Sequence, residues 1–204
     1  MSDSLTAVAL VCTLKSSPAR SSSELIARQL LNGFAGHGVD GDLIRVADHD
    51  VRPGVRIDEG DGDQWPGIRE RVRAADILVL STPVWLGHMS SVAQRVLERL
   101  DAELSETDDE GRPSMLGKVA TVAVVGNEDG AHKVIADVFQ GLDDIGFTIP
   151  AQGSTYWNGE AMQAVDYQDL DATPEAIASA TEAAARNAVH LARLLRGAQY
   201  PGYS

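Results

Sequence analysis

The strongest constraint on the fold is the way short apolar runs alternate with segments whose apolar residues recur at helical spacing. The first run, Leu5 to Cys12, reads LTAVALVC, and a nearly unbroken run of this kind is typical of a strand covered on both faces. Ala27, Leu30 and Phe34 then fall on one face of a helix. Because parallel strands need crossover connections, this succession favours a parallel sheet with helices on both faces.

The same alternation continues along the rest of the chain. We expect further strands at Asp42–Val46, Asp76–Ser81, Lys118–Gly126 and near Thr155. We expect further helices at Ile68–Ala75, Val92–Leu100, Ile135–Leu142 and from about Pro174 to Arg196. The polar stretches Val51–Gly67 and Ser105–Gly117 read as insertions on this scaffold. The pattern predicts one α/β domain over residues 1–204, built as a three-layer, doubly wound, five-stranded parallel sheet.

Charge and cysteine content exclude several classes of function. The chain has 30 acidic and 17 basic residues and a net charge of −13, whereas basic side chains supply most of the affinity for nucleic acids and anionic lipids. We therefore expect no nucleic-acid partner and no membrane partner. The single cysteine, Cys12, forms no internal disulfide and builds no cysteine-ligated metal site, so no metal is expected. Without a signal-peptide pattern at the start of the chain, a reducing cytoplasm is the expected compartment.

Ligands of doubly wound sheets bind beyond the carboxyl ends of the strands, here the loops after Cys12, Ser81 and Gly126. None of these loops carries the G-x-x-x-x-G-K-[ST] or G-x-G-x-x-G pattern of common nucleotide binders. The chain also lacks the G-x-S-x-G elbow of serine hydrolases. Nucleotide hydrolysis, a dinucleotide-type site and serine hydrolysis therefore lose support.

The first of these loops has the local chemistry of a phosphate site. It lies directly before a helix, whose N–H groups and dipole favour an anion. One of its serines could instead cap the helix while the others are solvated turn residues, and both interpretations stay open on this loop alone. Its candidate phosphate-binding residues are Thr13, Lys15, Arg20, Ser21, Ser22 and Ser23.

The second loop, Ser81–Ser91, reads STPVWLGHMSS. Pro83 restricts the backbone and Gly87 frees it, which suits a main chain that lies along the edge of a flat heterocycle. Trp85 could stack on such a ring or could be an ordinary core or interface aromatic. The third loop, Gly126–Ala131, reads GNEDGA and emerges at the same edge of the sheet.

These loops resemble those of the NADPH-dependent FMN reductase and multimeric flavodoxin-like quinone reductase families. The segment TPVWLGHMSS is similar to the T-P-x-x-x-G-x-M-S segment that meets the isoalloxazine ring in these families. The resemblance places Thr13, Lys15 and the serine trio in the phosphate loop, with Cys12 where the family has glycine. It implies ring contacts from Pro83, Val84, Trp85, Leu86 and Gly87. By position and glycine content it adds a third flavin-contacting loop made of Asn127, Glu128, Asp129 and Gly130.

The resemblance implies a flavodoxin-like strand order of 2-1-3-4-5 and one FMN per subunit, in preference to FAD because no second dinucleotide fingerprint is present. It implies a homodimer or homotetramer that uses NADPH or NADH as co-substrate and a quinone or flavin as acceptor. Since the flavin supplies the hydride chemistry, no catalytic side chain is named. The alternative is a flavodoxin-type carrier that passes single electrons to protein partners.

Two pairs of side chains near the expected site have no assigned role. His88 and His132 follow glycine or alanine close to the second and third loops and are candidates for contacts with flavin or substrate, or simple surface residues. Tyr156 and Trp157 follow the last expected strand and would either cover the flavin or pack in a subunit interface.

Overall fold

The structure, a computed structural model, describes residues 4–161 and 165–203. Its parallel strands are β1 (Thr6–Val11), β2 (Asp40–Arg45), β3 (Ile77–Trp85), β5 (Val119–Gly126) and β6 (Ser154–Asn158), and a short strand β4 (His88–Met89) follows β3. The helices are α1 (Ser22–Gly36), α2 (Trp65–Ala74), α3 (Ser91–Leu100), α4 (Ala131–Ile145) and α5 (Glu175–Gly197). Three 3-10 turns occupy Val46–Asp48, Asp101–Ser105 and Tyr167–Asp169.

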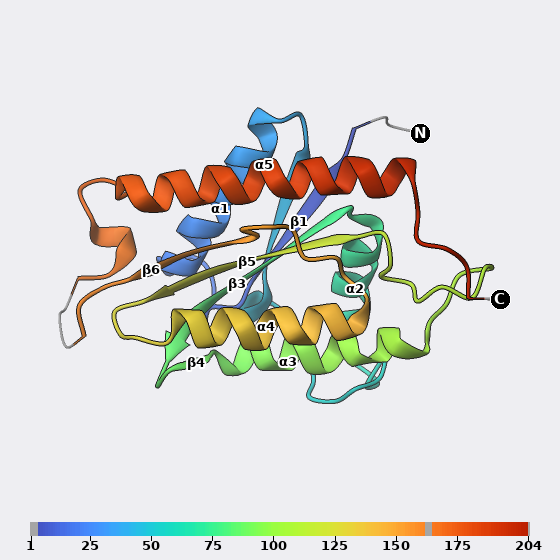
Figure 1. Ribbon diagram of the computed structural model, residues 1–204. Helices are drawn as coiled ribbons and strands as arrows, with labels where there is room; N and C mark the ends of the chain where they lie inside the picture. The colour runs from blue at the N-terminus through green and yellow to red at the C-terminus, as the bar shows by residue number, and fades with distance from the viewer. Residues whose placement is uncertain (1–3, 162–164, 204) are drawn as a thin grey trace.

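The five long strands form one parallel sheet in the order β2-β1-β3-β5-β6. Numbered as parallel strands along the chain, this is the expected order 2-1-3-4-5, so the predicted fold class is confirmed. The strand order reverses between β1 and β3, where a doubly wound sheet opens a crevice at its carboxyl edge. Figure 1 shows this edge at the end of the molecule that carries β4.

The predicted end of the third strand at Ser81 is wrong, because β3 continues to Trp85. Pairing explains the extension: Thr82 lies opposite Val124 and Pro83 opposite Val125, so β5 holds the segment in strand conformation. The chain then turns through Leu86 and Gly87, both with positive φ (52° and 72°), and returns as the antiparallel strand β4. Two central residues with positive φ are typical of a tight hairpin turn.

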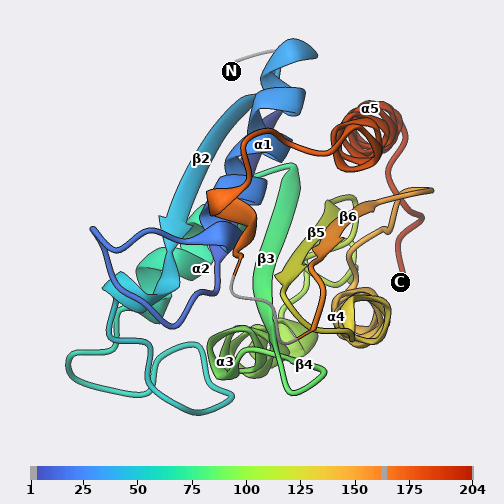
Figure 2. The same cartoon turned by 90° about the vertical axis from the view of Figure 1, so that its left-hand side faces the viewer.

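Helices cover both faces of the sheet, as Figure 2 shows from the end. One apolar cluster joins the sheet to α2, α3 and α4, and a second joins it to α1 and α5. Alternate residues of β1 divide between the two clusters: Val8 and Leu10 belong to the first, and Ala7 and Ala9 to the second. This division explains the unbroken apolar run, since neither face of the strand meets water.

The insertion before α2 is held in place by Arg99, whose side chain is fully buried. The guanidinium donates to three carbonyl oxygens, those of Arg52, Arg56 and Ile57, and pairs with the buried Asp63 carboxylate at 2.8 Å. This side chain therefore gives residues 52–63 a fixed path without regular secondary structure. None of the described helices is long and apolar enough to cross a membrane.

Candidate functional site

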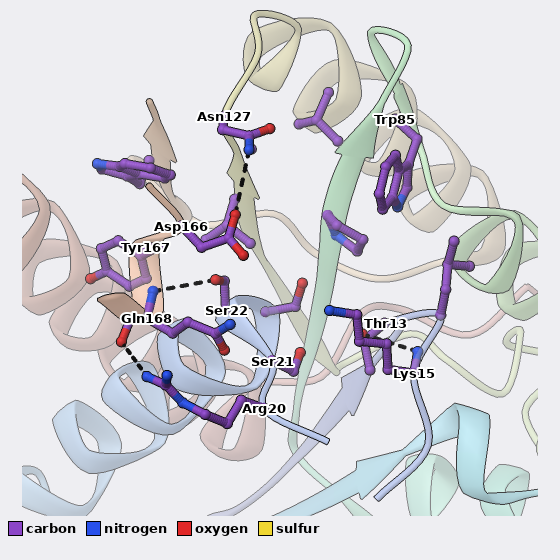
Figure 3. Close-up of a pocket in the computed structure, with 17 residues that line it drawn as sticks. Thr13, Lys15, Arg20, Ser21, Ser22, Trp85, Asn127, Asp166, Tyr167 and Gln168 are labelled. Atoms are coloured by element: carbon purple, nitrogen blue, oxygen red, sulfur yellow. Dashed lines mark hydrogen bonds between the residues drawn. The ribbon is translucent and has the colours of Figure 1, made fainter. Parts of the chain in front are cut away.

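A cavity of about 210 Å³ opens at the carboxyl ends of β1, β3 and β5, the edge where the sequence places the ligand. Figure 3 shows its lining residues converging from the loop after β1, from β3, and from a segment that follows β6. The structure brings together residues from all three predicted loops. Those of the predicted set that line the cavity are Thr13, Lys15, Arg20, Ser21, Ser22, Ser23, Pro83, Val84, Trp85 and Asn127.

One end of the cavity is the N-terminus of α1. Ser21 is the helix N-cap, and its hydroxyl accepts a hydrogen bond from the Glu24 N–H at 3.3 Å. Within the described chain, the N–H groups of Ser22 and Ser23 have no protein acceptor. The Lys15 ammonium lines the same cavity and likewise has no acidic partner among the described residues. Unpaired N–H groups, a free cation and the helix dipole together form a site for an anion such as phosphate.

Two buried serine hydroxyls hold the backbone around this anion site in place. The Ser81 hydroxyl donates to the Ser23 carbonyl at 2.7 Å, and the Ser90 hydroxyl donates to the Cys12 carbonyl at 2.6 Å. Burial raises the pKa of the Cys12 thiol, so it stays protonated and is a packing residue rather than a nucleophile. Ser81 thus ties the start of α1 to β3, and Ser90, the N-cap of α3, ties the start of the loop to that helix.

Arg45, which the sequence analysis did not single out, holds the loop from the β2 side. Its buried guanidinium pairs with Glu24 at 2.5 Å and donates to the carbonyl oxygens of Ala19 at 2.7 Å and Lys15 at 3.4 Å. The carboxylate of Glu24 also pairs with Arg28. Burial alone would raise the pKa of Glu24, but the hydrogen bonds from both arginines outweigh it and lower the pKa below its ordinary value.

The other end of the cavity is a slot between two walls. One wall is the end of β3, with Pro83, Val84 and a half-exposed Trp85. The opposite wall is aromatic, with the rings of Trp157 and Tyr167 lying 5.5 Å apart. Such a slot suits a flat heterocyclic ring, which buries both faces against apolar and aromatic groups.

Five predicted site residues do not line this cavity. They lie on the β3–β4 hairpin and in the loop after β5, where the Leu86 N–H donates to the Glu128 carboxylate at 2.6 Å. The backbones also meet closely, since a Cβ on Gly130 would lie 2.8 Å from the Gly87 Cα. These contacts hold the hairpin and the third loop together at the rim. The five residues are Leu86, Gly87, Glu128, Asp129 and Gly130.

The sequence left the roles of two histidines and of the Tyr156–Trp157 pair undecided, and of these four side chains one lines the cavity. Trp157 lines the cavity, whereas Tyr156 lies on the other face of β6 and meets His132 through a 2.7 Å hydrogen bond and an edge-to-face ring contact. The His88 ring nitrogen Nδ1 lies 2.7 Å from the Leu86 carbonyl oxygen, within the hairpin. Neither histidine lines the cavity.

Sequence reasoning missed the segment after β6, which supplies Asp166, Tyr167 and Gln168 to the cavity wall. It also assigned Arg20 to phosphate, and the structure turns this guanidinium toward that segment. Arg20 pairs with Asp169 at 2.8 Å and donates to the Gln168 carbonyl at 2.7 Å, as Figure 3 shows in part. The other lining residues that the sequence analysis did not name as contacts are Leu14, Val125 and Gly126.

Curated relatives match most of this chain but are themselves longer. Among curated relatives, a protein named divalent metal cation transporter MntH from Mycobacterium bovis is 37% identical over 171 residues, which cover 82% of this chain and 25% of that protein. The 8-demethyl-8-aminoriboflavin-5′-phosphate synthase of Streptomyces davaonensis is 33% identical over 166 residues, which cover 77% of this chain and 65% of that enzyme. This chain therefore spans a quarter of one relative and just under two thirds of the other.

Solved structures of flavin-binding proteins share the fold of this chain. The structure of RosB with the bound intermediate 8-demethyl-8-formylriboflavin-5′-phosphate has a TM-score of 0.87 and 30% identity, covering 97% of this chain and 82% of that one. An apo NADH:FMN oxidoreductase has a TM-score of 0.67 at 17% identity over 98% of this chain and 96% of that one, which supports the fold alone. The model of a family described as NADPH-dependent FMN reductase matches residues 7–162. With this match across most of its length, the chain belongs to the NADPH-dependent FMN reductase family.

Proposed function

We propose that the chain binds FMN in the cavity and works as an NAD(P)H-dependent oxidoreductase that passes electrons to a quinone or flavin acceptor. The observation that carries the proposal is the pairing of an anion site with an aromatic slot in one cavity. The unsatisfied N–H groups of Ser22 and Ser23 and the free Lys15 ammonium fit a phosphate. Trp157 and Tyr167 on one wall and Trp85 on the other fit a flat ring.

In this proposal, the protein binds and orients the flavin, and FMN supplies the capacity to accept and donate hydride. The N-terminus of α1 and Lys15 hold the phosphate, while Ser81 and Ser90 keep the loop backbone in position. The end of β3 lies along one side of the ring, fixed by its pairing with β5. The half-exposed Trp85 leaves the mouth of the slot open to a second substrate. The cytoplasm, where reduced nicotinamide is available, is the compartment that this function requires.

A direct test mixes the FMN-loaded protein with NADH and with NADPH under anaerobic conditions in a stopped-flow spectrometer. We expect one or both nucleotides to bleach the flavin faster than they bleach free FMN, and added benzoquinone to restore the oxidised spectrum. A protein that binds FMN but reacts with neither nucleotide would contradict the reductase function and favour a carrier.

A second candidate function is chemical modification of the flavin itself. The observation in its favour is the TM-score of 0.87 to a structure that holds a formylated riboflavin phosphate intermediate. In that case FMN would be a substrate that leaves as a changed product. Mass spectrometry of the flavin after incubation with protein and candidate amine donors separates the two functions, because a reductase returns FMN with its mass unchanged.

We also propose that the chain works as a homodimer or homotetramer. The side chain of Leu86 is 87% exposed and that of Trp85 is 54% exposed, and both lie on the hairpin beside the cavity mouth. Light scattering coupled to size-exclusion chromatography tests this proposal, and Leu86→Lys should shift the protein toward the monomer. A monomer at all accessible concentrations would contradict it.

A further inference from the structure

The segment after β6 forms a wall of the cavity that the family match does not include. Residues 166–169, which we call the strap, run past the start of α1, whereas the family model ends at residue 162. Figure 2 shows this part of the chain as the orange turn beside α1. Whatever the strap contributes to the ligand is therefore a property of this chain beyond the matched family region.

The strap is anchored firmly to α1. Tyr167 is 2% exposed, and its hydroxyl donates to Gln29 at 2.7 Å. The Gln168 N–H donates to the Ser22 hydroxyl at 3.3 Å, and Arg20 closes the other side through Asp169 and the Gln168 carbonyl. A wall held by this many contacts is preorganised, which reduces the cost of ordering it around a ligand.

The strap presents two hydrogen-bond acceptors to the cavity, the Asp166 carboxylate and the Gln168 side-chain oxygen. The only described partner of the Asp166 carboxylate is the amide of Asn127, at a long 3.4 Å, and no described cation pairs with it. The Gln168 Oε1 atom is buried without a described partner. Figure 3 shows Asp166 between the α1 end of the cavity and Asn127. A half-buried carboxylate with one long contact can accept further hydrogen bonds from a ligand that brings hydroxyl or N–H donors to it.

We propose that Asp166 is a specificity-determining residue that accepts hydrogen bonds from the hydroxyl groups of the ligand's ribityl chain. Its position supports this role. Gln168 contacts Ser22 at the phosphate end, and the Asp166 carboxylate meets the Asn127 amide of the third loop at 3.4 Å, between Ser22 and Asn127 in Figure 3. Asp166 therefore lies beyond the phosphate end, toward the middle of the cavity, where a polyol chain would join phosphate to ring. The inference rests on the proposed binding of FMN, and it holds whether FMN is cofactor or substrate.

Three flavins separate this role from other effects of the residue. Riboflavin has the hydroxyl chain without phosphate, lumiflavin has the ring without the hydroxyl chain, and FMN has all three parts. For Asp166→Ala we expect riboflavin to bind about tenfold more weakly, the cost of one hydrogen bond to a charged acceptor. FMN should lose less, since the substitution also removes a negative charge near its phosphate. Lumiflavin affinity should not change.

The measurement is quenching of flavin fluorescence on titration with each variant, after circular dichroism has confirmed folding. Asp171→Ala is the matched control, because Asp171 is an exposed carboxylate just beyond the strap and outside the cavity lining. It should leave all three affinities unchanged. Asp166→Asn, which keeps an acceptor oxygen without the charge, should recover part of the riboflavin affinity.

Two results would overturn the inference. One is an unchanged riboflavin affinity in Asp166→Ala, and the other is an equal loss for lumiflavin, which would place the residue against the ring. In both cases the unsubstituted protein still binds FMN, so the proposed function stands. If the unsubstituted protein binds none of the three flavins, the proposed function fails and the inference fails with it.

Discussion

Replacing Arg45 by methionine tests whether the phosphate loop is held from the β2 side. The guanidinium is the shared partner of the Glu24 carboxylate and of the Ala19 and Lys15 carbonyl oxygens, and it does not line the cavity. Methionine fills a similar volume but donates no hydrogen bond. Any effect on the ligand site therefore passes through the loop.

The magnitude follows from what the substitution leaves unpaired. Breaking a buried ion pair by removing one partner costs about 3–5 kcal/mol. Glu24 keeps its second partner, Arg28, and the Lys15 and Ala19 carbonyls lie in an exposed loop where water can replace the donor. We therefore expect the unfolding free energy to fall by about 2–3 kcal/mol, at or just below the lower end of that range. The midpoint of thermal unfolding should fall by roughly 5–10 °C in a domain of this size.

Urea unfolding followed by circular dichroism measures the change, with Arg28→Met as the matched control. Arg28 pairs with the same carboxylate, but its side chain is 57% exposed, so its loss should cost less than about 1 kcal/mol. The pKa of Glu24 is lowered from 4.5, so the stabilisation is present above that pH and is lost as the pH falls below it. Equal losses for the two variants, or a gap between Arg45→Met and the unsubstituted protein that does not narrow in acid, would refute the reasoning.

The other predictions concern the ligand, an acidic side chain and a glycine. Lys15→Ala should weaken FMN binding about five- to tenfold and leave riboflavin binding unchanged in a fluorescence titration, because only FMN carries the phosphate. Lys133→Ala, which removes an exposed lysine outside the cavity lining, should change neither. Burial raises the pKa of Asp63, but the hydrogen bonds from its arginine partner and from backbone N–H groups lower it from 3.8 to about 2. Asp63→Asn should therefore cost about 3 kcal/mol at neutral pH, and this loss should shrink in acid unfolding curves as the pH falls from 4 toward 2. Gly130→Ala should destabilise the protein by about 1–3 kcal/mol in thermal unfolding, because φ is +129° and the new Cβ would lie 2.8 Å from the Gly87 Cα.

The scaffold could be predicted because its signals are local. The apolar run of β1 and the helical spacing in α1 each fit within a short window of sequence, and strand order followed from the family resemblance of the loops. The extension of β3 was not visible in this way. The added residues, Thr82 to Trp85, include a proline and read as a loop, and pairing of Thr82 and Pro83 with β5 keeps them extended.

One end of the cavity could be predicted because its signals are also local in sequence. Loop chemistry placed the anion site at Ser22, but the strap shows no periodicity, and its position depends on partners more than 100 residues away, such as Gln29. Charge alone assigned Arg20 to the ligand, since its acidic partner lies 149 positions along the chain. One available signal was missed: neighbouring strand residues point to opposite faces, so Tyr156 and Trp157 were never candidates for the same role.

The strap lines the cavity but is not part of the sheet. The part of the site that the strap supplies can therefore change without a change in the strands. The sheet, the hairpin and the N-terminus of α1 come from the part of the chain that the family shares, up to residue 162. The strap comes after it and lines the cavity with Asp166, Tyr167 and Gln168. Exchanging the strap between relatives would transplant a ligand preference and leave the strands that carry the flavin site untouched. A library randomised at Asp166 and Gln168, with Tyr167 kept as the anchor, is the smallest one that samples this preference.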